Sequence, residues 1–207
     1  FYKLIIGDGN IHGQPLASSF AFYVLLESTG GHQESDNSRF ESALQAAFES
    51  EFIVDAVIAQ NKQQRENLWA IRDDIERLNQ QLFPSIVFDI SLGIRQMDGY
   101  VDEVRKQLTS RWPDSQMLVF GHLGDGNIHL VITVGSNKPD EIHAVESIVY
   151  EALGRCHGVI SAEHGIGLDK REYLKHSRSE EEIALMRTLK QALDPKGILN
   201  PGKIFEI

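Results

Sequence analysis

The stretch Met117–Val134, which reads MLVFGHLGDGNIHLVITV, organises the chain. Two apolar runs flank the pair Asp125-Gly126. An Asp-Gly pair between runs of this kind is a strong local signal for a β-hairpin with a two-residue loop, because both loop positions need a positive φ. If this pair forms the loop, His122 lies directly opposite His129.

Opposed residues of a hairpin project from the same face, with Cβ atoms roughly 4.5–5.5 Å apart. Two imidazoles at that separation are able to chelate one cation, and glycines on both sides of Asp125 leave the turn open. The alternative interpretation is a pair of polar residues on a solvent-facing rung. We favour a metal-binding or catalytic role for His122 and His129, because histidine pairs are uncommon.

The composition is that of an ordinary globular protein with a sizeable core, since 42% of the 207 residues are hydrophobic and 24% are charged. The net charge of −10 argues against nucleic acid or an anionic membrane surface as the main partner. No apolar run approaches the roughly 20 residues of a membrane span. The single cysteine, Cys156, fits a reducing compartment, so we expect the cytoplasm, or the mitochondrial matrix in a eukaryote. The sequence starts at Phe1 without an initiator methionine, and we expect it to be part of a longer protein.

Apolar runs predict three further strands, at residues 20–27, 52–59 and 86–92. Between the first two strands, a helix is predicted that begins near residues 36–38 and has Phe40, Leu44, Ala47 and Phe48 on one face. Helical spacing also predicts helices at residues 62–82, with an apolar stripe from Leu68 to Leu82, and around residues 97–108. A further helix should begin at Pro139 and end near His157-Gly158, and a last helix should begin with a capping box at Ser179. Its predicted core positions are Ile183, Met186, Leu189 and Leu193.

Helices of this regularity around an Asp-Gly hairpin predict an α+β fold, in which a mainly antiparallel sheet is covered by helices. The two strand–helix–strand stretches are interpreted as two ferredoxin-like halves. Residues 7–12 repeat the GDGNIH sequence of residues 124–129, but Gly13 and Pro15 stop a returning strand. We interpret this repeat as a loop and a coincidence, with a further ligand role for His12 as the alternative.

Glu163-His164 is the second pair of interest. It follows the short extended run at residues 159–162 and is followed by Gly165 and Gly167. Neighbours in an extended segment point to opposite sides, so one can face a cation while the other faces a substrate. Glu163 would complete a His-His-Glu set with His122 and His129, and catalytic zinc usually has three protein ligands and one open position. His164 would then be free to act as a base. The alternative is an exposed loop pair without a function.

The motifs around these residues resemble a known family. GHLGDGNIH at 121–129, SAEHGIG at 161–167, LNPGK at 199–203 and WAIR at 69–72 occur in the order found in the C-terminal domain of FAD-linked oxidases of the vanillyl-alcohol-oxidase type. Within that family the chain looks most similar to D-lactate dehydrogenase, D-2-hydroxyglutarate dehydrogenase and the glycolate oxidase flavin subunit. The resemblance covers about residues 20–207, and residues 1–19 would then be a lead-in from a preceding FAD-binding domain.

The resemblance implies a substrate or cap domain that covers the flavin of a 2-hydroxy acid dehydrogenase. His122, His129 and Glu163 match positions that hold a divalent metal, often zinc, and His164 matches the proposed base. Arg72 matches a residue that binds the substrate carboxylate; an ion pair with the neighbouring acids is its alternative role. Asn200 matches a position near the flavin. The implied partners are the FAD-binding domain, a small 2-hydroxy acid and an electron acceptor that the sequence does not name, and a homodimer is left open.

Two departures from the family pattern bear on the substrate. Val87 stands where many relatives have a lysine, and Val131 stands where relatives that bind dicarboxylates often have an asparagine. The resulting hypothesis is a domain that orients a D-2-hydroxy acid for oxidation to the 2-oxo acid by hydride transfer to FAD. The alternatives are a stand-alone metal-dependent hydrolase and a non-catalytic subunit that docks on a flavoprotein.

Overall fold

The computed structural model describes residues 1–205. The chain forms two compact units, the first from Phe1 to Gln81 and the second from Leu82 onward. Each unit is described by itself. Among the described residues, none of the helices has both the length and the apolar character that crossing a bilayer requires.

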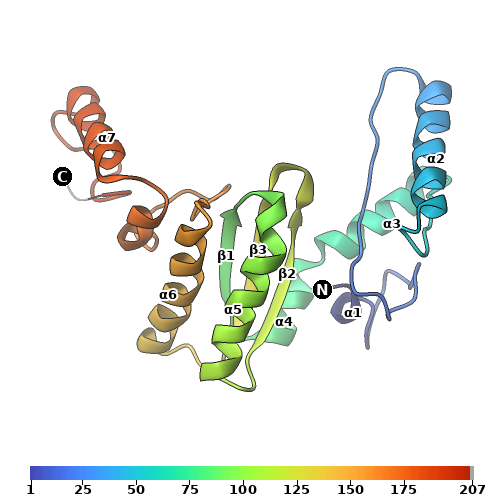
Figure 1. Cartoon of the computed structure of the whole chain (residues 1–207), viewed down its shortest axis with the longest axis horizontal. Coiled ribbons are helices and arrows are strands. Elements are labelled where there is room, and N and C mark those ends of the chain that lie inside the picture. The colour runs from blue at the N-terminus through green and yellow to red at the C-terminus, as the bar shows by residue number, and fades with distance from the viewer. Residues whose placement is uncertain (206–207) are drawn as a thin grey trace. The chain divides into compact units, whose positions relative to one another are not determined.

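The second unit is built on a three-stranded antiparallel sheet (Figure 1). Its strands are β1 (Ile86–Ser91), β2 (Gln116–His122) and β3 (Asn127–Thr133), in the order β1-β3-β2. The central strand β3 is buried at five of its seven positions, as expected of a strand with a neighbour on each side. The strands predicted at 86–92 and on both sides of the hairpin turn are therefore confirmed.

The hairpin register differs from the predicted one. His122 lies opposite Asn127, and Phe120 lies opposite His129. The connection consists of residues 123–126, because Leu123–Asp125 form a short 3-10 turn (η2) and only Gly126 takes a left-handed conformation, at φ 77°. The predicted two-residue loop, and with it the direct pairing of His122 with His129, is wrong. A shift of two residues keeps both side chains on the same face, so they remain diagonal neighbours.

One face of the sheet packs against α5 (Met97–Arg111), which follows the short 3-10 turn η1 (Ile94–Gln96), and α6 (Pro139–Arg155) (Figure 1). Phe88 lies in this core with its ring edge against Tyr150, at a centroid distance of 5.4 Å. Both helices begin and end close to the predicted residues. The core between sheet and helices contains, among others, Ile90, Ile128, Leu130, Ile132, Val104, Leu108, Val145 and Leu153.

Alternate residues of the strands point to the opposite face, which carries polar side chains. Asp89 of β1 lies directly opposite His129 of β3, and Asn127 and His122 follow at the end of the same hairpin. Beyond β1, Val159 forms a single antiparallel bridge with Ser91, so the predicted extended run at residues 159–162 begins beside the sheet.

The end of α6 shows why Gly158 is needed. His157, rather than the glycine, takes the left-handed conformation after the helix, at φ 53°. A Cβ atom on Gly158 would lie 2.3 Å from Leu153 Cδ1 and 2.9 Å from the carbonyl oxygen of Ser91. The glycine therefore permits the close approach of this segment to β1, and the predicted role of Gly158 at the helix end is corrected.

The first unit contains α1 (Tyr2–Ile5), α2 (Gln33–Glu49), α3 (Lys62–Asp73) and most of α4 (Ile75–Leu82). The single helix predicted at 62–82 is interrupted at Asp74, whose carboxylate accepts the Arg77 amide at 3.2 Å and pairs with His12. A small hydrophobic cluster in this unit contains the buried residues Tyr2, Ile5 and Ile71.

The strands predicted at residues 20–27 and 52–59 are wrong for this structure. Both segments lack ladder partners, and their large apolar side chains are exposed: Phe22 and Phe52 are 85% and 84% accessible. Apolar composition favours a strand, but the strand forms only where a neighbour supplies its hydrogen bonds. The two ferredoxin-like halves are therefore absent among residues 1–205, whereas the α+β class is confirmed.

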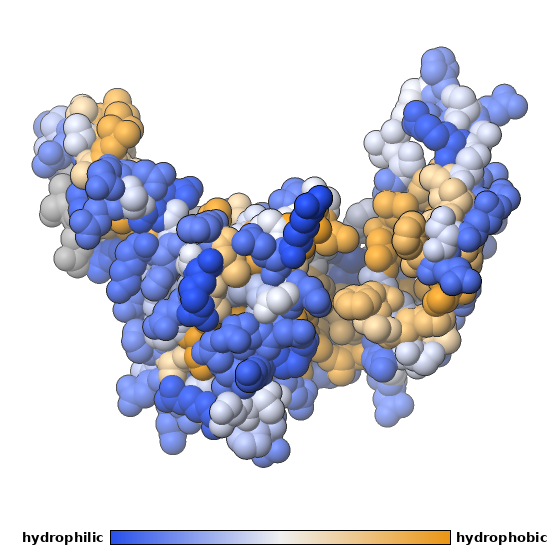
Figure 2. All heavy atoms as spheres, viewed as in Figure 1, coloured by the Kyte–Doolittle hydropathy of each residue, from blue (hydrophilic) through white to orange (hydrophobic). Residues whose placement is uncertain are grey.

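The end of the chain contains the 3-10 helix η3 (Arg171–His176) and α7 (Glu180–Leu193). The capping box at Ser179 is confirmed, with hydrogen bonds between Ser179 and Glu182 in both directions. Two of the predicted core positions of α7 are wrong, because Leu189 and Leu193 are 53% and 81% exposed. Figure 2 shows hydrophobic side chains gathered over this helix.

Candidate metal centre

Three metal-ligand side chains converge on the polar face of the second unit. His122 ends β2, His129 lies within β3, and Glu163 follows the extended run beside β1. One ligand atom of each lies within 4.8 Å of the others, and no other such group of three occurs among residues 1–205. His122 Nε2 is 3.8 Å from Glu163 Oε1, and the two imidazole centroids are 6.0 Å apart. The structure thus brings together the three residues that the sequence predicted.

The loop that carries Glu163 is held by β1. The Ala162 amide donates to the carbonyl oxygen of Asp89 at 3.2 Å. The amides of Glu163 and His164 both donate to Asp89 Oδ2, at 2.8 and 2.9 Å. Three successive amides of the loop therefore donate to one residue of the neighbouring strand. These hydrogen bonds fix the backbone position of Glu163 and His164 relative to β1.

Asp89 remains a carboxylate although its side chain is only 1% exposed. Burial raises its pKa, but the two amide hydrogen bonds and the positive charges of His164 and Lys170 outweigh burial, so the net pKa is lowered. A negative charge is thereby kept next to His129 Nδ1, 3.8 Å from Oδ1. The only local sign of this role in the sequence is an acid within a mainly apolar strand.

Asn127 is a second residue that sequence reasoning missed. It is buried at 4% exposure, and its Nδ2 donates to Glu163 Oε1 at 2.7 Å. Its Oδ1 has no hydrogen-bond partner among the described residues. Asn127 therefore steadies one carboxylate oxygen of Glu163 from the hairpin side, a contact between residues 36 positions apart in the sequence.

His164 lies next to this group but outside it. Its side chain is 63% exposed, its Nδ1 is 3.7 Å from Asp89 Oδ2, and its ring centroid is 6.4 Å from that of His129. An exposed imidazole beside a group of metal ligands is accessible to a small molecule bound there. The predicted roles of Glu163 as a ligand and of His164 as a base stay predictions.

Arg72 and Asn200 lie elsewhere in the chain. Arg72 belongs to α3 of the first unit, where its guanidinium pairs with Asp73 at 3.1 Å, the alternative role that the sequence suggested. Asn200 lies in the turns after α7, exposed and at φ 46°. Their roles toward substrate and flavin stay predictions.

His12 also belongs to the first unit. Its Nε2 lies 3.0 Å from Asp74 Oδ2, and this hydrogen bond is the main cause of the lowered pKa of Asp74. The repeated GDGNIH segment forms a loop, as predicted. The metal-ligand group described above does not include His12.

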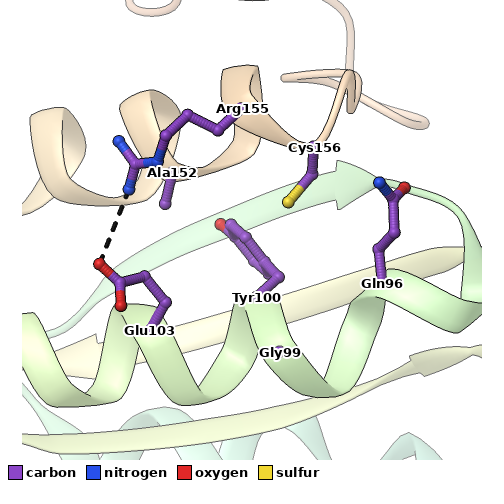
Figure 3. Close-up of a pocket in the computed structure, with 7 residues that line it drawn as sticks. All are labelled: Gln96, Gly99, Tyr100, Glu103, Ala152, Arg155 and Cys156. Atoms are coloured by element: carbon purple, nitrogen blue, oxygen red, sulfur yellow. Dashed lines mark ion pairs between the residues drawn. The ribbon is translucent and has the colours of Figure 1, made fainter.

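A separate pocket of about 270 Å³ lies between α5 and α6 (Figure 3). Tyr100 and Cys156 point into it, and an ion pair between Glu103 and Arg155 closes one end. Both helices cover the face of the sheet opposite to Asp89 and His129. The pocket is therefore separate from the metal-ligand group.

The donor set fits a divalent cation such as Zn²⁺. Two imidazole nitrogens and one carboxylate oxygen are a known ligand set for catalytic zinc, which keeps a further position for water or substrate. The side chains of His122 and Glu163 are 45% and 51% exposed, so a small molecule could reach such a position. The side chain of His129 is only 12% exposed, because this residue lies within the central strand β3.

The chain belongs to the FAD-linked oxidase C-terminal domain family, whose model matches residues 3–204.

Individual relatives carry more specific names. The chain is 37% identical over 191 residues to D-2-hydroxyglutarate dehydrogenase, mitochondrial, of Arabidopsis thaliana, a match that covers 92% of the chain and 34% of that protein. It is 36% identical over 213 residues to D-2-hydroxyglutarate dehydrogenase of Stutzerimonas stutzeri, covering 97% of the chain and 44% of that protein. The chain thus spans between a third and a half of the length of these relatives.

Proposed function

We propose that this chain is the substrate- and metal-binding domain of an FAD-dependent dehydrogenase that oxidises a D-2-hydroxy acid to the 2-oxo acid. The observation that carries the proposal is the group formed by His122, His129 and Glu163, with the exposed His164 beside it. Membership of the FAD-linked oxidase family favours flavin chemistry over the alternative of a metal-dependent hydrolase.

His122, His129 and Glu163 would hold the cation and leave a position open on their exposed side. A divalent cation in this position would lower the pKa of a coordinated hydroxyl group and neutralise negative charge on a bound carboxylate. The side-chain amide of Asn127 donates to Glu163 Oε1, the oxygen that lies 3.8 Å from His122 Nε2, and so restrains the orientation of the carboxylate.

His164 is the proposed general base. It would accept the proton of the substrate hydroxyl, because its imidazole is exposed next to the ligand group and histidine is the most common general base in enzymes. FAD would supply the two-electron oxidation, and we expect the cofactor to be bound mainly by a domain outside this chain.

The family resemblance assigns roles to two further residues, Arg72 and Asn200. The Arg72 guanidinium would bind the substrate carboxylate through charge-assisted hydrogen bonds. Asn200 would contact the flavin from the turns after α7. Val87 and Val131 offer no charge to a second carboxylate, and Val131 is buried at 1% exposure. D-lactate and D-2-hydroxyglutarate are therefore the substrates to compare.

The first test removes the ligands in the intact flavoprotein. His122→Ala and Glu163→Ala should each abolish bound metal, measured by plasma mass spectrometry, and most turnover of a D-2-hydroxy acid. His143→Ala is the matched control, because this histidine lies in the same unit but bonds to Tyr173 instead. Full activity after the metal has been stripped and excluded would disprove the role of the cation.

The second test separates the base from the ligands. His164→Ala should retain the metal and reduce kcat by roughly 10²–10⁴-fold, the usual effect of losing a general base. An unchanged kcat, or loss of the metal together with activity, would contradict the assignment of His164.

A further inference from the structure

We propose that Asp89 is the positioning residue of the metal centre: its buried carboxylate sets the Glu163–His164 segment on one side and orients His129 on the other. The inference rests on the proposed function of this group and extends it to a residue outside the three proposed ligands. Asp89 suits this task because it lies directly opposite His129 in the β1–β3 register and beside the loop.

One oxygen of Asp89 organises the loop. Oδ2 accepts the successive amides of Glu163 and His164, while the backbone oxygen of the same residue accepts the Ala162 amide. Consecutive amides that converge on an anion form a small anion-binding nest, and such charge-assisted hydrogen bonds are about twice as strong as neutral ones. The nest fixes the backbone from which a metal ligand and the proposed base both project.

The other oxygen of Asp89 faces the sheet. Oδ1 is buried without a hydrogen-bond partner among the described residues and lies 3.8 Å from His129 Nδ1. A buried acceptor left without a donor costs free energy, so fold stability alone does not explain this orientation. A proton on His129 Nδ1 would face this oxygen and leave Nε2 for the cation, which is the usual carboxylate–histidine–metal arrangement.

The far end of the loop has its own support. Lys170 Nζ donates to Ser161 Oγ at 2.9 Å, and Ser161 Oγ donates to the carbonyl oxygen of Gly165 at 2.8 Å. The segment between Ser161 and Gly165 is thereby closed on itself. The hydrogen bonds to Asp89 then set the position of this closed loop relative to His122 and His129.

The test measures zinc affinity of the intact protein by competition with a chromophoric chelator. In Asp89→Asn, one side-chain oxygen cannot serve both the two amides and His129, so the zinc Kd should rise 10- to 100-fold, as for other residues that orient metal ligands. Asp194→Asn is the matched control, because Asp194 is also buried and also accepts two backbone amides, from Ile198 and Leu199. Its zinc Kd should stay within about twofold of wild type.

A measurement on the wild-type protein covers the case in which Asp89→Asn does not fold. The ¹⁵N shifts of the His129 imidazole in the zinc-loaded protein should show a protonated Nδ1 and a metal-bound Nε2. An unchanged Kd in a folded Asp89→Asn, or zinc bound through Nδ1, would overturn the positioning role while leaving the metal centre intact. A wild-type protein without zinc affinity would overturn both.

Discussion

The substitution Gly121→Ala tests the observed hairpin register, on which the position of His122 depends. Gly121 lies opposite Ile128, where a Cβ atom would be 2.4 Å from the carbonyl oxygen of Asn127 and 2.8 Å from Ile128 Cα. Both neighbours are backbone atoms of the central strand, so no side chain can move aside. The strands would have to separate by about 1 Å to reach an ordinary contact distance.

Overpacking of this kind costs about 1–3 kcal/mol, and the upper half of that range applies because rigid backbone is displaced. A loss of about 2–3 kcal/mol corresponds to a Tm decrease of roughly 4–12 °C in a protein of this size. The separation also moves His122 relative to His129, and a loss of about 1.4 kcal/mol in binding raises the zinc Kd about tenfold. We expect both effects in Gly121→Ala.

Thermal unfolding and zinc competition check the two effects. Gly124→Ala is the control in the same hairpin, because a Cβ atom at Gly124 would meet nothing within 4 Å. It should change the free energy of unfolding by less than about 0.5 kcal/mol. A Gly121→Ala protein with wild-type Tm and zinc affinity would refute the register and favour a two-residue Asp125-Gly126 loop, in which Gly121 faces Leu130.

Three further predictions concern the rest of the second unit. Phe88→Ala should lower the free energy of unfolding by about 3–5 kcal/mol, measured by urea denaturation, because Phe88 is buried at 1% exposure in the core. Ser179→Ala should cost about 1 kcal/mol and speed amide exchange in the first turn of α7, because it removes the capping box; unchanged exchange would disprove that role. Hydrogen bonds from Lys190 and from the Leu199 amide lower the pKa of Asp194 below the ordinary value of 3.8. Since a depressed carboxyl pKa stabilises the fold above the unfolded pKa, Asp194→Asn should be less stable than wild type at neutral pH, and the difference should shrink as the pH falls below 3.8. A difference that stays constant down to low pH would contradict the assignment.

Elements with a local signal could be predicted from the sequence. Pro139 marks the first position of α6, and Ser179 with Glu182 marks the start of α7. These signals act within a few residues, so no knowledge of the fold is needed to interpret them. The apolar spacing of α5 predicted its buried side for the same reason.

Elements that depend on distant partners could not be predicted. The run at residues 20–27 is as apolar as a buried strand, yet in this structure Phe22 is exposed and the segment lacks a ladder partner. The hairpin turn shows the same limit on a smaller scale. The Asp-Gly pair predicts a tight loop, but Asp125 is part of a 3-10 turn and its carboxylate accepts the Asn127 amide at 3.3 Å.

The candidate metal centre also contains residues that could be predicted from the sequence and residues that could not. His122, His129 and Glu163 were predicted because their residue types and glycine-rich surroundings suggest metal ligands. Asp89 and Asn127 were missed, because their roles arise from hydrogen bonds to a loop 36 or more residues away in the sequence. An acid in an apolar strand is the only local sign of such a role.

The most direct test of the metal centre is the anomalous zinc signal in crystals of the zinc-loaded protein. We predict one zinc ion within about 2.0–2.2 Å of one nitrogen of His122, one nitrogen of His129 and one oxygen of Glu163. A zinc ion bound at other residues, or no anomalous peak next to these three side chains, would contradict the central claim.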